Sequence, residues 1–251
     1  MNILSSDIIG LAFVLVFFGG MVVMAVRSRN RPGRNIRDIS AFAHLRRVVG
    51  LAVESGTRLH ISIGWESTSG QPSAPALAGL SMLERITRAA SISDRPPVVT
   101  SGDGTLAMLS QDTIRAANRA MAAEGQYDPN SGRVSGLTPF SYAAGAMPVI
   151  YDEQVSANVI AGHFGLEVAL IIEAGDRKGS LTVAGTDQVP VQAVLYAAAQ
   201  EPLIGEELYA GGAYLGSGLM HLASLRTQDI FRWVIVAIIL LGAIAKLVGS
   251  L

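Results

Sequence analysis

The chain has 251 residues, half of them apolar, and a formal net charge of −1. This length allows one good-sized hydrophobic core in addition to separate apolar segments. The sequence contains no cysteine, which excludes disulfides and thiolate chemistry. Its near-neutral charge shows no surface of the kind that nucleic acids bind, so we expect no nucleic-acid partner.

The first predicted element is a membrane helix over the uncharged run of nineteen residues from Ile8 to Val26. As a helix with a rise of ~1.5 Å per residue, this run covers ~28 Å, close to the hydrocarbon thickness of a bilayer. A cleaved signal peptide is the alternative, but no Lys or Arg precedes the run and arginines follow it directly. Because residues 1–7 carry no Arg, the positive-inside rule predicts the N-terminal tail outside and the following domain in the cytoplasm.

A basic linker, 27–40, separates this helix from a predicted α/β domain at 41–229. Apolar runs that are typical of strands alternate there with helical patterns, which predicts a mostly parallel sheet with covering helices. The strands are nearly all apolar, as expected when both faces of a sheet are buried. The expected strands are Leu59–Ile63, Pro97–Thr100, Asn158–Ala161 and Leu181–Ala184, and the expected helices are Ala41–Ser55, Ala74–Ala90, Thr105–Glu124, Leu166–Ala174 and Val189–Ala199.

Two stretches of the domain give less regular patterns. Turn signals from Gln126 to Phe140 indicate an irregular loop or a hairpin. The stretch from Tyr142 to Glu153 has mixed signals around Pro148 and receives no assignment. After Gln200 the pattern is helical, with a break near residues 216–218.

A second membrane segment is predicted at 230–251, although only thirteen uncharged residues, Trp233 to Ala245, precede Lys246. The segment spans if Lys246 extends its stem toward the far headgroups while Trp233 lies in the near interface. A buried core helix and an interfacial helix are the alternatives. With two spans, both termini lie outside and the chain resides in the inner (plasma) membrane.

Each predicted strand runs into a glycine with polar neighbours, and in a parallel sheet these turns meet along one edge. That edge is the expected site for a small-molecule ligand, although the same glycines and polar residues also serve as turns and helix caps. Residues 102–107 fit the loose pattern G-x-G-x-x-A, but Asp103 would repel a phosphate, so we expect no cofactor. The candidate ligand-binding residues are Gly64, Gly102, Asp103, Gly104, Thr105, Gly185, Thr186 and Asp187.

His163 falls at one of these turns, where Ser101, His163 and Asp187 together would permit hydrolysis. No G-x-S-x-G pattern accompanies them, and a capping histidine is the alternative. The four histidines are scattered singly, so no metal site is expected.

Small residues are dense in the segment after the last predicted helix of the domain. Glycine inside a helix costs up to ~1 kcal/mol relative to alanine, so such a segment suggests a compensating helix contact. Packing within one subunit and a subunit interface are both compatible with it. The predicted interface residues are Gly205, Tyr209, Gly212, Ala213 and Gly216.

Three stretches carry a resemblance to a known family: Ile204–Leu215 (IGEELYAGGAYL), Val99–Gly104 and Ala184–Asp187. With these, the chain resembles an uncharacterised family of bacterial membrane proteins that is classified only as a domain of unknown function. The resemblance covers most of residues 55–232 and implies a single domain, without an activity, cofactor or catalytic residue.

The sequence therefore leaves three hypotheses for function. The first is a non-enzymatic, membrane-anchored scaffold that assembles into a homo-oligomer. The second is a membrane-tethered module that binds or senses a small molecule, including a nucleotide, at the strand-end turns. The third is a hydrolase that uses Ser101, His163 and Asp187.

Overall fold

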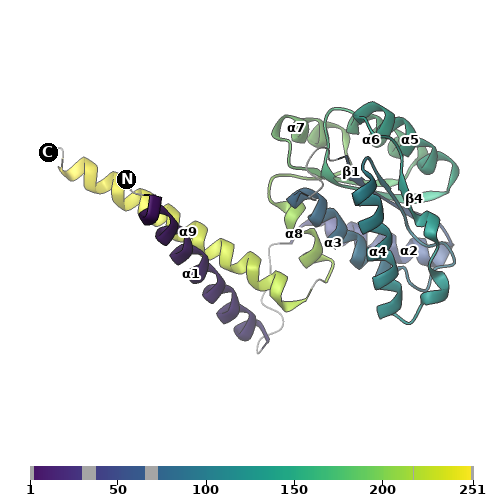
Figure 1. Cartoon of the computed structure of the whole chain (residues 1–251). Helices are drawn as coiled ribbons and strands as arrows, with labels where there is room; N and C mark the ends of the chain where they lie inside the picture. The colour runs from purple at the N-terminus through teal and green to yellow at the C-terminus, as the bar shows by residue number, and fades with distance from the viewer. Residues whose placement is uncertain (1–2, 30–37, 66–72, 217, 250–251) are drawn as a thin grey trace. The chain divides into compact units, whose positions relative to one another are not determined.

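A computed structural model describes residues 3–29, 38–65, 73–216 and 218–249 and divides into two compact units (Figure 1). One unit comprises residues 38–216, and the other comprises 1–37 together with 217–251. Most of the predicted linker, and residues 66–72 after the first strand, lie outside the described residues.

The unit 38–216 alternates strands and helices, as the sequence predicts. All of the predicted strands and helices of the alternating pattern are present, with shifted ends. The elements are α2 (Ser40–Ser55), β1 (Arg58–Gly64), α3 (Ala74–Ala89), β2 (Val98–Ser101), α4 (Gly104–Ala120), the short 3-10 turns η1 (Glu124–Gln126) and η2 (Pro129–Ser131), β3 (Gly132–Val134), α5 (Pro139–Asp152), β4 (Val155–His163), α6 (Val168–Lys178), β5 (Leu181–Thr186), α7 (Val189–Ala198), β6 (Glu201–Leu203) and α8 (Glu207–Tyr214).

The six strands form one sheet in the order β3-β2-β1-β4-β5-β6, and every neighbouring pair is parallel. This arrangement confirms the predicted fold class. The first strand, β1, lies in the middle of the sheet, and β2 and β3 follow outward on one side of it. The next strand, β4, lies on the other side of β1, and β5 and β6 follow outward from there. The strand order therefore reverses between β1 and β4.

Helices cover both faces of this sheet (Figure 1). On one face, Leu59, Ile61 and Ile63 of β1 pack in a core with buried residues of α2, α3, α4 and α8. On the other face, buried residues of α5, α6 and α7 pack around Ile160 of β4 and Ala184 of β5. The result is a three-layer α/β/α unit in which the sheet is the middle layer.

The second face also buries a polar network, which corrects the expectation that the strands are nearly all apolar. His60 of β1 is fully buried, and its ring nitrogens lie 2.8 Å from Asn158 Oδ1 and 2.9 Å from Thr100 Oγ1. The hydroxyl of Tyr142, from α5, hydrogen-bonds to Ser62 and lies 3.2 Å from Thr100 Oγ1. Polar side chains are tolerated here because they bind one another across three strands.

The other unit consists of two long apolar helices, α1 (Ile3–Arg29) and α9 (Leu219–Gly249). By length and composition, each can cross a membrane, over Ile8–Arg27 and Met220–Leu247. The helices contact each other: the rings of Phe13 and Phe17 each lie 5.5 Å from the ring of Phe231.

Some elements differ from the sequence expectation. Residues 142–152, left unassigned because of Pro148, belong to α5. The strand β3 lies in the stretch predicted as an irregular loop or a hairpin, and β6 lies in a stretch predicted as helical. The C-terminal helix begins at Leu219, so residues 219–229, predicted as part of the domain, are continuous with the apolar segment. Between α8 and α9 the helical pattern breaks near Gly216, as expected.

Candidate functional site

The carboxyl ends of β1 and β4 lie side by side at the point where the strand order reverses. In open parallel sheets, ligands bind in the crevice outside these ends. The two strands approach closely here, because a Cβ atom on Gly162 would lie 1.8 Å from the carbonyl oxygen of Ile63. Gly64 takes a φ of +87°, which the backbone needs to leave β1 toward Trp65 and which favours glycine.

His163 and Asp187 meet at this edge. His163 ends β4, and Asp187 follows β5, its neighbour in the sheet. Nδ1 of His163 lies 2.9 Å and 3.1 Å from the two carboxylate oxygens of Asp187. Both side chains are about 28% exposed, so the pair is held in place and remains open to solvent.

Trp65 and Glu167 join the pair from the two strands at the reversal point. The indole N–H of Trp65 donates to Oε1 of Glu167 at 2.9 Å, and the indole ring packs edge-on against the ring of His163 at 6.1 Å. Glu167 is only 3% exposed, and it also accepts the backbone N–H of Gly165 at 2.8 Å. We call Trp65, His163, Glu167, Asp187 and Gln188 the edge cluster.

Polar contacts extend the edge cluster toward β6 and α8. The side-chain nitrogen Nε2 of Gln188 lies 3.4 Å from Nε2 of His163. Gln192 of α7 connects the ends of β5 and β6, since it donates to the carbonyl of Thr186 at 2.9 Å and accepts from the backbone N–H of Gly205 at 3.2 Å. Burial and the charge of Asp187 raise the pKa of Tyr209. The hydroxyl of Tyr209 is therefore close enough to the edge cluster to interact with it electrostatically.

The predicted candidates Ser101 and Asp103 lie apart from His163 and Asp187. Two strand spacings separate Ser101 from His163 in the sheet, which is about 10 Å. The hydroxyl of Ser101 is directed at the carbonyl oxygens of Asp103 and Arg133, at 3.1 Å and 3.3 Å. The structure therefore brings together two of the three predicted hydrolase residues.

The pattern at residues 102–107 forms the start of α4, where Asp103 caps the helix. Its carboxylate accepts the backbone N–H groups of Thr105 and Leu106 at 2.7 Å and 3.1 Å. Gly104 and Thr105 are the first residues of that helix, and Gly102 packs against Trp65. A phosphate at this helix terminus would have to displace the chain's own carboxylate.

Gly185 and Thr186 lie at the end of β5 and are buried. A Cβ atom on Gly185 would lie 3.0 Å from Cβ of Leu203 and 3.2 Å from Cδ1 of Leu208. The Thr186 hydroxyl accepts the backbone N–H of Phe164 at 3.2 Å. Both residues are therefore buried beneath the end of the sheet and are not available to contact a ligand.

The predicted interface residues divide into two groups. Gly212 and Ala213 are buried in the chain, on the helix α8 that packs against α3. The neighbouring Gly211 shows how tight this contact is, since a Cβ atom there would lie 2.5 Å from Sδ of Met82. Gly205, Tyr209 and Gly216 are exposed. The small residues thus provide packing within the subunit, and an interface at this segment stays a prediction.

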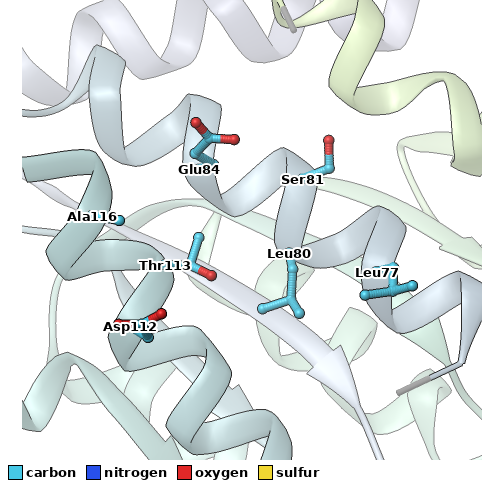
Figure 2. Close-up of a pocket in the computed structure, with 7 residues that line it drawn as sticks. All are labelled: Leu77, Leu80, Ser81, Glu84, Asp112, Thr113 and Ala116. Atoms are coloured by element: carbon cyan, nitrogen blue, oxygen red, sulfur yellow. The ribbon is translucent and has the colours of Figure 1, made fainter. Parts of the chain in front are cut away.

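Two hollows lie elsewhere on the unit. The first, of about 360 Å³, lies between α3 and α4, and its lining includes Leu80 and Glu84 of α3 and Asp112 of α4 (Figure 2). The second, of about 310 Å³, contains Arg115, whose guanidinium lies 6.0 Å from the ring of Tyr127. Neither hollow contains a predicted site residue.

Within the part of the chain that the structure describes, no group of three His, Asp or Glu side chains is placed to hold a metal ion. The sequence expectation grouped Ser101, His163 and Asp187 at the strand-end turns. It missed Glu167, which follows Gly165 closely and begins the next helix with a carboxylate. An acid two residues after a strand-end glycine was the available signal.

Comparison with known proteins matches residues 2–251 to a family model described as "Domain of unknown function (DUF6754)". No curated protein and no solved structure matches the chain. The resemblance to a family known only as a domain of unknown function is thereby confirmed, over nearly the whole chain. The chain belongs to the DUF6754 family.

Proposed function

We propose that the chain is a membrane-anchored protein whose α/β unit binds a small molecule at the edge cluster. The observation that carries this proposal is the position of the cluster at the carboxyl ends of β1, β4 and β5, where the strand order reverses. At that position an indole, an imidazole, two carboxylates and an amide converge. Such convergence of polar groups at a reversal point is typical of ligand sites in open parallel sheets.

The charges of the cluster favour a neutral or cationic ligand over a phosphate. Glu167 and Asp187 are both acidic, and Glu167 already occupies the backbone N–H of Gly165, a group that would otherwise attract an anion. The Asp103 carboxylate occupies the start of α4 in the same way. We therefore propose a ligand that offers hydroxyl or amino donors to the exposed carboxylate of Asp187 and a ring or sugar face to Trp65.

Anchoring by α1 and α9 is part of the proposal. Both helices are long and apolar enough to cross a bilayer, and their apolar side chains are exposed. Arginines concentrate between α1 and the α/β unit, which supports a cytoplasmic location of the unit in an inner membrane.

The proposal is tested by ligand titration of the full chain in detergent or lipid. With Trp233→Phe, Trp65 is the single remaining tryptophan, and its fluorescence reports directly on the cluster. A panel of sugars, nucleosides and amines should include a compound that changes this fluorescence and raises the melting temperature by mass action. Silence of both signals across the panel would contradict the proposal.

A matched pair of variants assigns the binding to the cluster. Asp187→Asn removes a charge-assisted hydrogen bond, and we expect a loss of affinity of about tenfold or more. Asp112→Asn removes an exposed aspartate in the hollow between α3 and α4 and should leave the affinity unchanged. Equal effects of the two substitutions would place binding outside the edge cluster.

We propose no hydrolase, because the hydroxyl of Ser101 is bound to backbone carbonyls two strands away from His163. A scaffold that self-assembles is the second candidate. The exposed apolar faces of α1 and α9 favour it, because membrane helices of two copies can pack on such faces.

A further inference from the structure

Large apolar side chains are exposed directly beside the edge cluster. Leu166 lies between His163 and Glu167 in the sequence and is 65% exposed. Val189 directly follows Gln188 and is 74% exposed. Because neighbouring Cα atoms are only ~3.8 Å apart, both apolar residues lie next to members of the cluster.

The connection from β3 to α5 adds two exposed apolar residues at the same edge. A Cβ atom on Gly102, which packs against Trp65, would lie 3.2 Å from the carbonyl oxygen of Gly136. Leu137 is the next residue and is 73% exposed. Phe140, in the first turn of α5, is 66% exposed. We call the four exposed residues the apolar rim: Leu137, Phe140, Leu166 and Val189.

The opposite edge of the sheet has a different composition. Four of the connections there, 56–57, 153–154, 179–180 and 199–200, contain only glycine, alanine and polar or charged residues. The exposed apolar residues are therefore concentrated at the carboxyl edge, around the edge cluster. Exposed apolar patches that border polar groups are typical of binding surfaces.

We propose that the ligand of the edge cluster is an amphiphile, with an amino or hydroxyl head at Asp187 and an apolar chain that lies on the apolar rim. This inference rests on the proposed ligand site and names the class of its ligand. The exposed carboxylate of Asp187 suits a head that donates hydrogen bonds. A wholly polar ligand would leave the rim in water, whereas a chain attached to the head would cover it.

One molecule occupies both surfaces because the two are continuous along the chain. Leu166 and Val189 are each bonded to a member of the edge cluster, so a chain of a few methylenes reaches from the head to the rim. Such a ligand can come from water or from the bilayer in which α1 and α9 are proposed to lie. The recognised chemistry is the same for both sources.

The test titrates the full chain carrying Trp233→Phe, in phosphatidylcholine vesicles, with butylamine, hexylamine and octylamine. The fluorescence of Trp65, the single remaining tryptophan, reports binding at the cluster. Full burial of a methylene raises an affinity about fourfold, so partial burial on the rim should give about tenfold between butylamine and hexylamine, after correction for partition into lipid.

A higher ratio of lipid to protein distinguishes the two sources. Binding should follow the mole fraction of the amine in the lipid if the site takes it from the bilayer, and the free concentration of the amine if the site takes it from water. Either dependence fits an amphiphile.

A matched pair of variants assigns the chain of the ligand to the rim. Leu166→Ser combined with Val189→Ser should reduce the affinity ratio of hexylamine to butylamine from about tenfold to about twofold. Ile92→Ser is the control, since Ile92 is 78% exposed in the connection between α3 and β2, at the opposite edge. It should leave the ratio unchanged.

The outcomes separate this inference from the proposed function. Binding of butylamine without any gain for hexylamine would overturn the amphiphile and leave the proposed ligand site in place. An unchanged ratio in the double variant would also overturn it, because the chain would then lie elsewhere. Silence of Trp65 with all three amines would overturn it as well, and the panel of sugars, nucleosides and amines then decides on the proposed site independently.

Discussion

At the scale of single residues, His60 is held neutral in the middle of the sheet. Burial lowers its pKa from 6.5 to about 4, although the hydrogen bond to Asn158 acts in the opposite direction. In the neutral ring, Nδ1–H donates to Oδ1 of Asn158 and Nε2 accepts from the hydroxyl of Thr100, and the side chain is fully buried. A buried neutral histidine makes the stability of the fold sensitive to acid. At low pH its ring binds a proton in the unfolded chain but stays unprotonated in the folded chain, which favours unfolding.

We therefore predict that the free energy of unfolding decreases as the pH falls from about 6.5 to about 4. In this window the unfolded state binds the proton and the folded state does not, and the pKa difference corresponds to on the order of 3 kcal/mol. His60→Gln keeps hydrogen-bonding groups but cannot titrate, so its stability should depend less on pH across the same window. Denaturant unfolding of both proteins at several pH values measures the difference, and parallel pH profiles would show that His60 does not contribute.

At the scale of elements, the glycines of α8 act in packing against α3. A side chain at Gly211 would enter the space of Met82, whose Sδ lies 2.5 Å from the position of a Cβ atom. We predict that Gly211→Leu lowers the free energy of unfolding by about 1–3 kcal/mol through overpacking. Gly50→Ala, in α2 with nothing within 4 Å, should instead raise it by up to about 1 kcal/mol. Chemical denaturation distinguishes the two signs, and a neutral Gly211→Leu would show that α8 and α3 are loosely packed.

The strands and helices that the sequence predicted are those in which burial of the side chains produces a regular pattern of apolar residues. The central strands carry apolar runs because both faces are covered, whereas β3 and β6 are three-residue strands at the edges of the sheet. An edge strand needs no such run, and Pro202 in β6 is compatible only with an edge position. The helix α5 was missed because Pro148 lies inside it. Alternation in β1, where polar His60 and Ser62 separate apolar residues, was a readable signal of one polar face.

The sequence predicted where the site lies better than it predicted which residues form it. Strand-end turns meet at one edge in any parallel sheet, so the meeting of His163 and Asp187 followed once their strands were neighbours. The order of the strands in the sheet decides which turns are adjacent. The sequence pattern shows where the strands are but does not reveal this order. With β1 and β4 between them, Asp103 and Asp187 lie three strand spacings apart, about 14 Å.

At the scale of the whole molecule, one chain joins an α/β unit that buries its apolar side chains to a pair of helices that exposes them. The unit 38–216 has its own core on both faces of the sheet, while α1 and α9 have exposed apolar side chains and suit a lipid environment. Because the α/β unit lies between the two helices in the sequence, a double crossing keeps both termini on the same side. The cytoplasmic side that we propose for the unit is motivated by charge, since arginines are concentrated directly after the first apolar run and absent before it.

This topology predicts how single cysteines react with a membrane-impermeant maleimide in intact cells. Asp94→Cys, at an exposed position of the α/β unit, should be protected until the membrane is permeabilised, because the proposed topology places the unit in the cytoplasm. Ser5→Cys, in the tail before the first apolar run, should react without permeabilisation. The cysteine-free parent chain is the blank for both. Labelling of Asp94→Cys in intact cells, with Ser5→Cys protected, would reverse the orientation, and labelling of both positions would remove the double crossing itself.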